Sequence, residues 1–317
     1  MALNYPVREP STRDSTPYLL TTGTTPPSIT APSATGIPGA PVSLTTRDLI
    51  NSLRTPIEVT ELHFVVTETN VLLANNVGWW MGGIEVNLAL GIHQLTQGFC
   101  PVGALGVRRE ALALEGNLSG GAAPPIYSNT IRWILPQPLI VGPNEGFSGS
   151  MRLSPNLTPF PTGGTGNTVV TLSMVARGRR LPAGTPVPAS RAVPFASGWI
   201  FSAASANAPD VSFQNVFPDR ILHVTSLNAV PVSANIGVDL SGTFSINAPG
   251  GIANGVIRAL AGALVHVGDI FSNRNALEEA HDLNPGEGYK ILHGGTYSPV
   301  AGTNVGISAA MIGWREE

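Results

Sequence analysis

The sequence predicts an all-β protein composed of two successive β-domains. Two stretches, residues 85–92 and 236–246, alternate apolar and polar residues, which is typical of antiparallel strands with one buried face. The chain holds 36 glycines and 28 prolines among its 317 residues, a composition that suits many short strands joined by turns. In addition, one turn sequence and one strand irregularity each occur twice, in the same order along the chain.

Residues 1–44 differ in composition from the rest of the chain. They contain eight prolines and a dense scatter of serine and threonine, with little apolar periodicity. Such a segment cannot form a core by itself. We therefore expect an extended N-terminal arm, which is either a disordered tail or an arm that is ordered only against partner subunits.

A few short helices are expected among the strands. Thr45 and Asp48 form a capping-box-like start, and the apolar residues that follow share a helical face. A second short helix is predicted over residues 275–281. The run 255–271 fits either a helix or a strand, and it is too short and too polar to span a bilayer.

The alternation in each predicted strand assigns one set of side chains to the core. In the strand at 85–92 this set is Val86, Leu88, Leu90 and Ile92. In the strand at 236–246 it is Ile236, Val238, Leu240, Phe244 and Ile246. The opposite faces are polar or small, so each strand belongs to a half-buried sheet.

The turn sequence Pro-x-Glu-Gly-aromatic occurs twice. Its members are Pro143, Glu145, Gly146 and Phe147 in the first copy, and Pro285, Glu287, Gly288 and Tyr289 in the second. Proline fixes φ and lacks an N–H, glycine permits positive φ, and the aromatic residue restarts a strand. The two glutamates either accept hydrogen bonds from turn N–H groups or point into solvent. Both readings make them corner residues and not catalytic carboxylates.

The strands on either side of these turns also match. Residues 56–66 resemble residues 220–230, and in both the apolar alternation slips by one residue, as it does at a β-bulge. After each turn an alternating strand closes the repeat, with Met174-Val175 corresponding to Met311-Ile312. A shared irregularity indicates a duplicated domain better than matched residues do.

The repeat divides the chain. We predict a first β-domain over residues 45–182, a linker over 183–194 and a second β-domain over 195–317. Each domain is long enough for about eight short strands, which is the size of a jelly-roll barrel. The predicted fold is therefore two tandem eight-stranded jelly-roll barrels, a double jelly roll, behind the N-terminal arm.

Composition limits the function. The net charge of −3 argues against nucleic-acid binding driven by bulk charge, so we expect no sequence-specific nucleic-acid partner. Only 12% of residues are charged, which suits a protein covered largely by neighbouring subunits. The N-terminus shows no signal-peptide pattern, so synthesis in the cytoplasm is expected. The single cysteine, Cys100, excludes an intrachain disulfide and is expected in the core.

No catalytic, cofactor-binding or metal-binding residue is predicted. Cupin-type metal sites in jelly rolls need clustered ligands, whereas the six histidines are scattered. They are His63, His93, His223, His266, His281 and His293. The chain has neither a Gly-x-Ser-x-Gly elbow nor a P-loop. Trp79 and Trp80 are candidates for subunit contact or for packing over the barrel end, both ahead of ligand binding.

Four stretches carry a resemblance to a known family. They are "RTPIEVTELHFVV" (54–66), "GIHQLTQGFCPVGALG" (91–106), "WILPQPLIVGPNEGF" (133–147) and the closing "MIGWREE" (311–317). With the arm and the repeat, the chain resembles the double jelly-roll major capsid proteins of tailless icosahedral viruses, especially bacteriophages with an internal membrane. The resemblance covers most of residues 50–317 and is one of architecture and pattern.

The resemblance implies a structural virion protein without catalysis. Three copies would form a pseudo-hexameric capsomer, and capsomers would tile an icosahedral capsid shell by self-assembly. Implied partners are the protein itself, minor capsid or vertex proteins, and an internal viral membrane reached through the arm. The alternative from a different class is a two-domain β-sandwich carbohydrate-binding protein, adhesin or virion spike.

Overall fold

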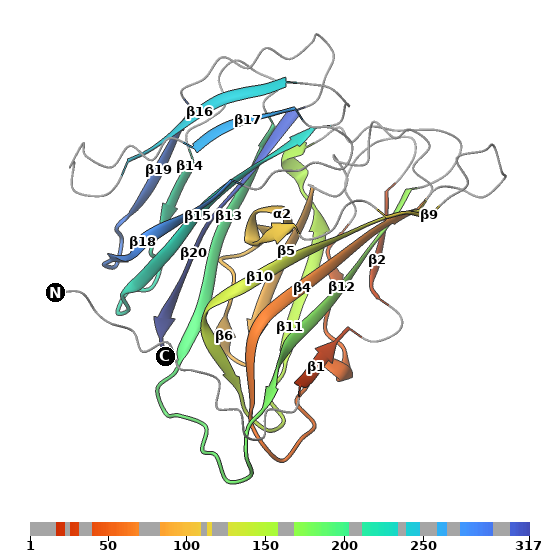
Figure 1. The fold of residues 1–317 in the computed structure, drawn as a ribbon, viewed down its shortest axis with the longest axis vertical. Helices are drawn as coiled ribbons and strands as arrows, with labels where there is room; N and C mark the ends of the chain where they lie inside the picture. Colours follow the sequence, from red (N-terminus) through yellow and green to blue (C-terminus); the bar gives the residue numbers. More distant parts are fainter. Residues whose placement is uncertain are drawn as a thin grey trace.

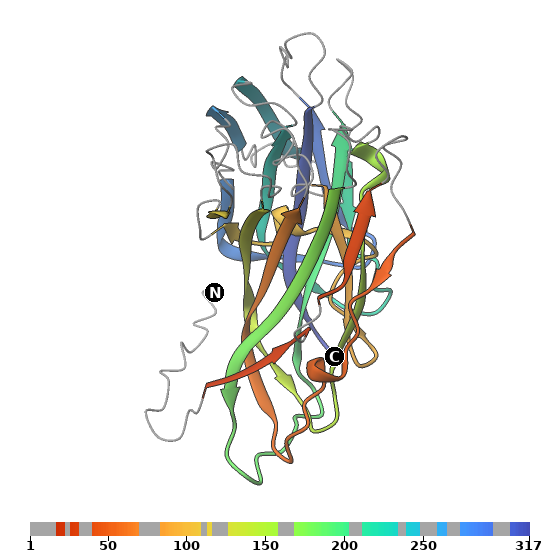
Figure 2. The ribbon, with the colours of Figure 1, turned by 90° about the vertical axis from the view of Figure 1, so that its right-hand side faces the viewer.

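The structure is a computed structural model of the whole chain. It describes residues 17–22, 26–31, 40–69, 83–108, 113–115, 126–157, 168–202, 211–233, 239–247, 259–264, 273–293 and 305–317. The described residues form two β-barrels, each made of two sheets, and the barrels lie side by side (Figure 1). In the view turned by 90°, the long strands of both barrels run along the length of the molecule (Figure 2).

The first barrel, barrel 1, consists of a seven-stranded and a five-stranded sheet. The larger sheet has the order β1 (Pro17–Thr21), β12 (Thr168–Arg180), β4 (Ile57–Thr69), β10 (Ile126–Val141) and β8 (Val107–Arg108), with β2 (Ser28–Ala31) on β12 and β9 (Ala113–Glu115) on β10. The smaller sheet has the order β3 (Val42–Ser43), β11 (Phe147–Leu153), β5 (Ile84–Leu90) and β6 (His93–Gln94), with β7 (Cys100–Pro101) on β5.

The second barrel, barrel 2, has two four-stranded sheets. One has the order β13 (Ala192–Ser202), β20 (Val305–Glu316), β15 (Leu222–Ser233) and β18 (Asn273–Leu283). The other has the order β14 (Val211–Gln214), β19 (Gly288–His293), β16 (Asp239–Asn247) and β17 (Ala259–Leu264). When the strands of barrel 2 are numbered from one to eight along the chain, beginning with β13, the first sheet has the order 1-8-3-6 and the second has the order 2-7-4-5. This double-sheet, eight-stranded arrangement is a jelly roll.

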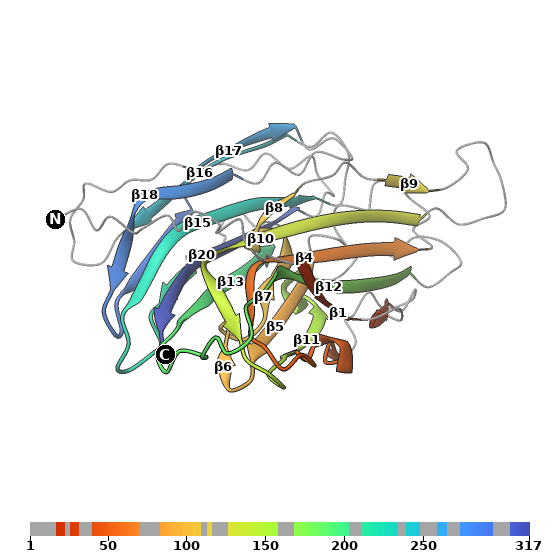
Figure 3. The ribbon, with the colours of Figure 1, turned by 60° about the horizontal axis from the view of Figure 1, so that its bottom comes forward.

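Barrel 1 repeats this order. β1, β12, β4 and β10 take the first, eighth, third and sixth places, and β3, β11, β5 and the short pair β6 and β7 take the others. The all-β class and the two tandem jelly rolls predicted from the sequence are therefore confirmed. Figure 3 shows both barrels from below, and α2 (Val102–Leu105), which is labelled in Figure 1, lies between them.

The region predicted as an extended arm contributes strands to barrel 1. β1, β2 and β3 all lie within residues 17–43, and Leu20 and Ile29 are buried in the core. A short strand at the edge of a sheet needs few buried side chains, so a Pro- and Thr-rich sequence is tolerated there. The expected arm is thus corrected for these residues, and residues 1–16 lie outside the description. The predicted linker also ends earlier, because β13 begins at Ala192.

The predicted shared bulge is confirmed in both barrels. In barrel 1 the register of β12 against β4 skips Thr60, and in barrel 2 the register of β20 against β15 skips Thr225. The residue opposite the bulge is a glycine in each case, Gly178 and Gly313. A Cβ on these glycines would lie 2.1 Å from the Glu58 carbonyl oxygen and 2.3 Å from that of His223. The bulge brings the two backbones so close that only glycine fits.

The bulge also corrects the predicted match between the closing strands. Once Gly178 is aligned with Gly313, Met311 corresponds to Ala176, two residues from the predicted Met174. The pairing supports this, because Ala176 lies opposite Leu62 and Met311 lies opposite Leu227. The prediction therefore placed these side chains on the correct face of the closing strands, but it aligned the two strands two residues out of register.

The helix predictions fare less well. The first is a single 3-10 turn, Arg47–Leu49, and the second is wrong, because residues 275–281 lie in strand β18. Pairing of β18 with β15 outweighs the local capping pattern. The run 255–271, left open between helix and strand, includes strand β17, while the rest of it lies outside the description.

One predicted core residue is on the surface. Val86, Leu88 and Leu90 are buried as predicted, whereas Ile92 is 92% exposed. The cause is Gly91, whose φ of 57° turns the chain out of strand β5 before Ile92 is reached. The core of barrel 1 is otherwise formed by the inward side chains of both sheets, including Phe64, Trp133 and Phe147.

Candidate functional site

The two predicted corners have the same backbone geometry. In the first, the N–H of Glu145 donates to the carbonyl of Gly142 at 3.2 Å; in the second, the N–H of Glu287 donates to that of Asn284 at 3.0 Å. Proline occupies the second position of each turn, and a residue with positive φ occupies the third. That residue is Asn144 (φ 62°) or Gly286 (φ 80°). Proline followed by positive φ is the pattern of a type II turn.

The glutamate side chain closes each corner. Oε2 of Glu145 accepts a hydrogen bond from the N–H of Gly142 at 2.8 Å. Oε2 of Glu287 accepts one from the N–H of Asn284 at 2.8 Å. Of the two readings of these carboxylates, the structure shows the hydrogen-bonded one at both corners. The aromatic residue of the first corner, Phe147, is buried in barrel 1.

Sequence reasoning missed a buried asparagine that holds each corner from the other side. At the first corner the N–H of Asn51 donates to the carbonyl of Glu145, and the N–H of Asn144 donates to the carbonyl of Asn51, both at 2.8 Å. At the second corner, Asn215 exchanges the same two bonds with Glu287 and Gly286, at 2.8 and 3.0 Å. The asparagine is thus paired to the turn through its backbone.

The asparagine side chains repeat as well. Nδ2 of Asn51 donates to the carbonyls of Thr55 and Val141, and Nδ2 of Asn215 donates to those of Arg220 and Leu283. Each Oδ1 accepts the N–H two residues further on. The available sequence signal was an asparagine nine or ten residues before each bulge threonine, since Asn51 precedes Thr60 and Asn215 precedes Thr225.

The first corner has an extra partner from the segment between the barrels. Arg191 donates from Nη1 to Oε2 of Glu145 at 2.8 Å and from Nη2 to Oε1 at 2.5 Å. Nη1 also donates to the carbonyl of Ile140 at 2.7 Å. Burial alone would raise the pKa of Glu145, but the hydrogen bonds from Arg191 and Gly142 offset it, and the pKa is lowered. The corner of barrel 1 is therefore ionised and cross-linked to the start of barrel 2.

Arg191 also joins this corner to the end of strand β20. Its backbone exchanges two hydrogen bonds with Glu317, at 2.9 and 3.0 Å. Oε1 of Glu317 accepts from Nε of Arg315 at 2.5 Å. Arg315 is buried over the ring of Phe217, at 4.1 Å, and burial lowers the pKa of its guanidinium.

The barrels dock through one face of barrel 2. We call it the outer face of barrel 2: the side of the β13–β20–β15–β18 sheet turned away from its own core, carrying Ser226, Asn228, Ala196, Gly198, Ala310 and Ile312. All except Gly198 are among the buried residues, and Ala196, Ala310 and Ile312 belong to the hydrophobic cluster of barrel 1. Small side chains here let the two barrels approach closely.

Hydrogen bonds and steric fit fix this junction. The N–H of Gln97 donates to the carbonyl of Ala196 at 2.8 Å, in a parallel bridge between the barrels. Nδ2 of Asn228 donates to the carbonyl of Ala104 in α2 at 2.8 Å. A Cβ on Gly198 would lie 2.3 Å from Sγ of Cys100. The two barrels therefore form one continuous packed unit.

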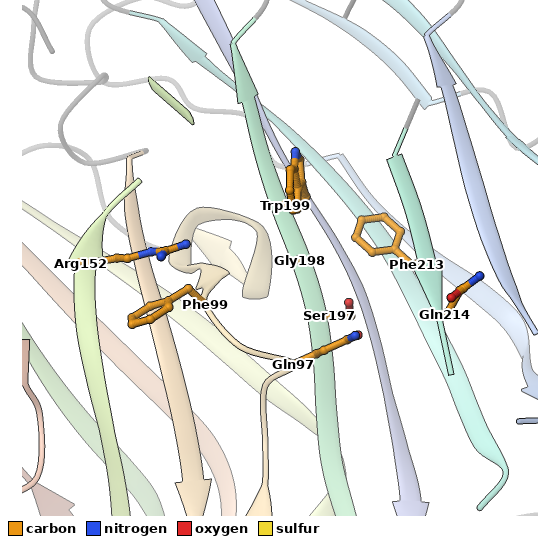
Figure 4. Close-up of a pocket in the computed structure, with 8 residues that line it drawn as sticks. All are labelled: Gln97, Phe99, Arg152, Ser197, Gly198, Trp199, Phe213 and Gln214. Atoms are coloured by element: carbon orange, nitrogen blue, oxygen red, sulfur yellow. The ribbon is translucent and has the colours of Figure 1, made fainter. Parts of the chain in front are cut away.

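A pocket of about 290 Å³ opens at the junction (Figure 4). Its lining residues are Gln97, Phe99, Arg152, Ser197, Gly198, Trp199, Phe213 and Gln214. The Arg152 guanidinium lies 4.1 Å above the ring of Phe99 and donates to Glu85 at 2.6 Å. Trp199 is 47% exposed although it follows the buried Phe195 on the same side of β13. Aromatic rings beside amide and hydroxyl groups suit side-chain packing or the binding of a ligand. These lining residues do not pair a nucleophile with a general base.

Other predicted features add no chemistry. Trp79 and Trp80 lie outside the described residues. Within the part of the chain that the structure describes, no group of three or more His, Cys, Asp or Glu side chains is placed to hold a metal ion. In the same part, no helix has both the length and the apolar character needed to cross a membrane. Cys100 is buried, which raises the pKa of its thiol.

Comparison with known proteins gives structural likeness only. No protein-family model matches the sequence, and no curated protein matches it. The crystal structure of the STIV MCP is similar, with a TM-score of 0.49 and 10% identity over 94% of this chain and 96% of that chain. A cryo-EM structure of the Sputnik virophage has a TM-score of 0.26 and 9% identity over 96% and 84% of the two chains. At these values, the fold assignment rests on the strand order of the chain itself.

Proposed function

We propose that this protein is a major capsid subunit, a structural virion protein whose activity is self-assembly. The observation that carries the proposal is the docking of two barrels with the same topology, the same bulge and the same corner within one chain. A chain that already contains one barrel-to-barrel contact can extend the pattern by repeating that contact between copies. Three copies then form a pseudo-hexameric capsomer of six barrels.

The finer features belong to the same proposal. Capsomers tile an icosahedral shell in the virion of a tailless bacteriophage, where the subunit meets further copies and minor capsid or vertex proteins. The N-terminal arm reaches towards an internal membrane. The low charge content and the single lysine, Lys290, support a chain buried among copies of itself.

The competing function is carbohydrate recognition by a two-domain β-sandwich protein. Trp199 and the junction pocket are the observation that favours it, because an exposed indole beside polar groups suits sugar binding. The purified chain separates the two functions. Light scattering and negative-stain microscopy should find trimers and larger shells, whereas a stable monomer that binds glycans in an array would refute the capsid proposal.

A further inference from the structure

The junction pocket contains a hydrogen-bond acceptor that the chain itself does not use. Oε1 of Gln97 is buried and has no hydrogen-bond partner in the described part of the chain. The backbone N–H of the same residue donates to the carbonyl of Ala196 at 2.8 Å, which holds Gln97 at the junction. A buried acceptor without a donor destabilises the folded chain unless a bound molecule supplies the donor. The side chain of Gln97 is therefore placed to bind a ligand that carries hydroxyl or N–H groups.

The pocket is built by elements of both barrels. Gln97 and Phe99 belong to the segment between β6 and β7 of barrel 1, whereas Trp199 and Phe213 lie on β13 and β14 of barrel 2. β13 and β14 are edge strands of the two sheets of barrel 2. Figure 4 shows Gln97 extending from barrel 1 towards β13. The pocket thus opens where the edges of two sheets meet the neighbouring barrel.

One aromatic surface of the pocket is open to a ligand. The side chain of Trp199 is 47% exposed, whereas Phe213 is 2% exposed. Ser197 lies two residues before Trp199 on the same strand, so the two side chains share a face. An accessible indole beside hydroxyl and amide groups packs against the apolar C–H face of a sugar ring, while the polar groups bond to its hydroxyls.

The charge of the pocket is balanced by a buried carboxylate. Nε of Arg152 donates to Oε2 of Glu85 at 2.6 Å, and Oε1 of Glu85 accepts from the hydroxyl of Ser154 at 2.9 Å. The side chain of Glu85 is 3% exposed, so this pair is held inside barrel 1. An anionic ligand would compete with Glu85 for the guanidinium, and a neutral ligand would not. The pocket therefore suits an uncharged molecule.

We propose that the junction pocket binds one neutral pyranose ring, free or at the end of a glycan. Trp199 packs against the apolar face of the ring, and Oε1 of Gln97 accepts a hydrogen bond from one of its hydroxyls. A volume of about 290 Å³ holds one such ring together with bridging waters. This site goes beyond the capsid function and does not depend on it. The competing function above concerns a chain that stays monomeric, whereas this site is compatible with assembly.

A nucleoside is the alternative ligand of similar size. Flat bases are held by stacking between aromatic or apolar side chains. The ring of Phe99 already has the Arg152 guanidinium over it at 4.1 Å, and the ring of Phe213 is buried. Of the three lining rings, Trp199 is the most exposed. A single open aromatic surface beside several polar groups suits a pyranose better than a base.

Saturation-transfer NMR on the purified full-length chain tests the proposal. The probes are the methyl glycosides of glucose, galactose, mannose and N-acetylglucosamine, and the comparison compounds are uridine and glucuronate. We expect at least one methyl glycoside to bind with a Kd of about 1 mM, as suits a ligand with few heavy atoms. Uridine and glucuronate should bind about tenfold more weakly or not at all.

Two variants assign the binding to this pocket. Trp199→Ala and Gln97→Leu should each weaken binding of the glycoside about tenfold. Gln97→Leu should unfold at the same temperature as the native chain or at a higher one, because it removes a buried acceptor that has no partner. The matched control is Ile92→Ala, at a residue that is 92% exposed and outside the pocket lining, and it should leave binding unchanged.

Each other result overturns the proposal. It fails if no methyl glycoside binds at concentrations up to about 50 mM. Equal or tighter binding of uridine or glucuronate would assign the pocket to another class of ligand. Binding that survives both pocket substitutions would place the sugar elsewhere, and a lower unfolding temperature for Gln97→Leu would give that residue a structural role instead.

Assembly is measured separately by light scattering on the same samples. Loss of the sugar site with assembly intact leaves the capsid function standing. A monomeric chain that binds the glycoside through Trp199 and Gln97 supports the site and refutes the capsid function.

Discussion

Arg191 and Glu145 form a two-bond ion pair that ties the start of barrel 2 to the corner of barrel 1, with N–O distances of 2.8 and 2.5 Å. The corner of barrel 2 has the same backbone turn and the same glutamate cap, so the ion pair is an addition to a repeated device. Glu287 has instead a hydrogen bond from the side chain of Asn284 at 3.0 Å. The asymmetry gives the first corner a second role in holding the barrels together.

We expect Arg191→Leu to lower the free energy of unfolding by about 2 kcal/mol, since it leaves a partly buried carboxylate without its main hydrogen-bond donor. Arg191→Lys should recover only part of this, because lysine cannot make both bonds at once. The measurement is urea unfolding followed by tryptophan fluorescence. The loss of stability in the double variant Glu145→Gln, Arg191→Leu is compared with the sum of the losses in the two single variants. If the double variant is no more stable than this sum predicts, the two residues are not coupled and the interpretation is wrong.

The buried asparagines should matter more than the glutamates they contact. We expect Asn215→Ala to cost about 2–3 kcal/mol, because the carbonyls of Arg220 and Leu283 and the N–H of Phe217 lose their partner. Glu287→Ala should cost about 1 kcal/mol, since the released N–H of Asn284 is exposed and water can satisfy it. Comparing the two variants by thermal unfolding checks the order, and an equal cost would contradict it.

How far the sequence could predict these features depends on where each signal lies. The bulges were predictable because the slip in apolar parity around Thr60 and Thr225 is local. The corners were predictable because proline constrains the backbone directly. The predicted role of the motif glycines was wrong, since the positive φ lies at Asn144 and Gly286, whereas a Cβ on Gly146 or Gly288 would meet neighbouring backbone at 2.8 or 2.0 Å. The roles of Asn51 and Asn215 were not predictable, because their side chains bond to Val141 and Leu283, 90 and 68 residues away.

The edge strands show a second limit. Among the residues of β1 and β2 whose burial is described, one side chain in each strand is buried, Leu20 and Ile29, in a context of proline and threonine that is also typical of a disordered arm. Their strand conformation comes from pairing with β12, which supplies the hydrogen bonds that the segment cannot provide itself. Likewise β18 carries a capping pattern that predicts a helix, and only pairing with β15 decides for a strand.

Acid should destabilise barrel 1 through Glu61, which lies in strand β4. Hydrogen bonding from Arg132, against the cost of burial, lowers the pKa of Glu61 from 4.5 to about 2. Because the folded pKa lies below the unfolded one, the carboxylate contributes stability above pH 4.5 that is lost as the pH falls towards 2. Solvent screening keeps the contribution below the roughly 3 kcal/mol that the full shift would give.

Glu61→Gln tests this. The variant should be less stable than the native chain at pH 7 and should lose less stability than the native chain between pH 4.5 and pH 2.5. Urea unfolding at a series of pH values measures the difference. Parallel pH profiles for the two proteins would show that another group governs the acid response.

The bulge glycines give the sharpest comparison between the barrels. Gly313→Ala places a Cβ 2.3 Å from the His223 carbonyl oxygen, and Gly178→Ala places one 2.1 Å from that of Glu58. Because backbone atoms on both sides must shift, we expect each variant to lose about 1–3 kcal/mol. Gly103→Ala in α2 is the control, since its Cβ would meet nothing within 4 Å, and helix propensity favours alanine there. Equal losses for the two bulge variants would indicate that the duplicated irregularity does the same structural work in both barrels, whereas a neutral Gly313→Ala would mean that the bulge in barrel 2 is not constrained.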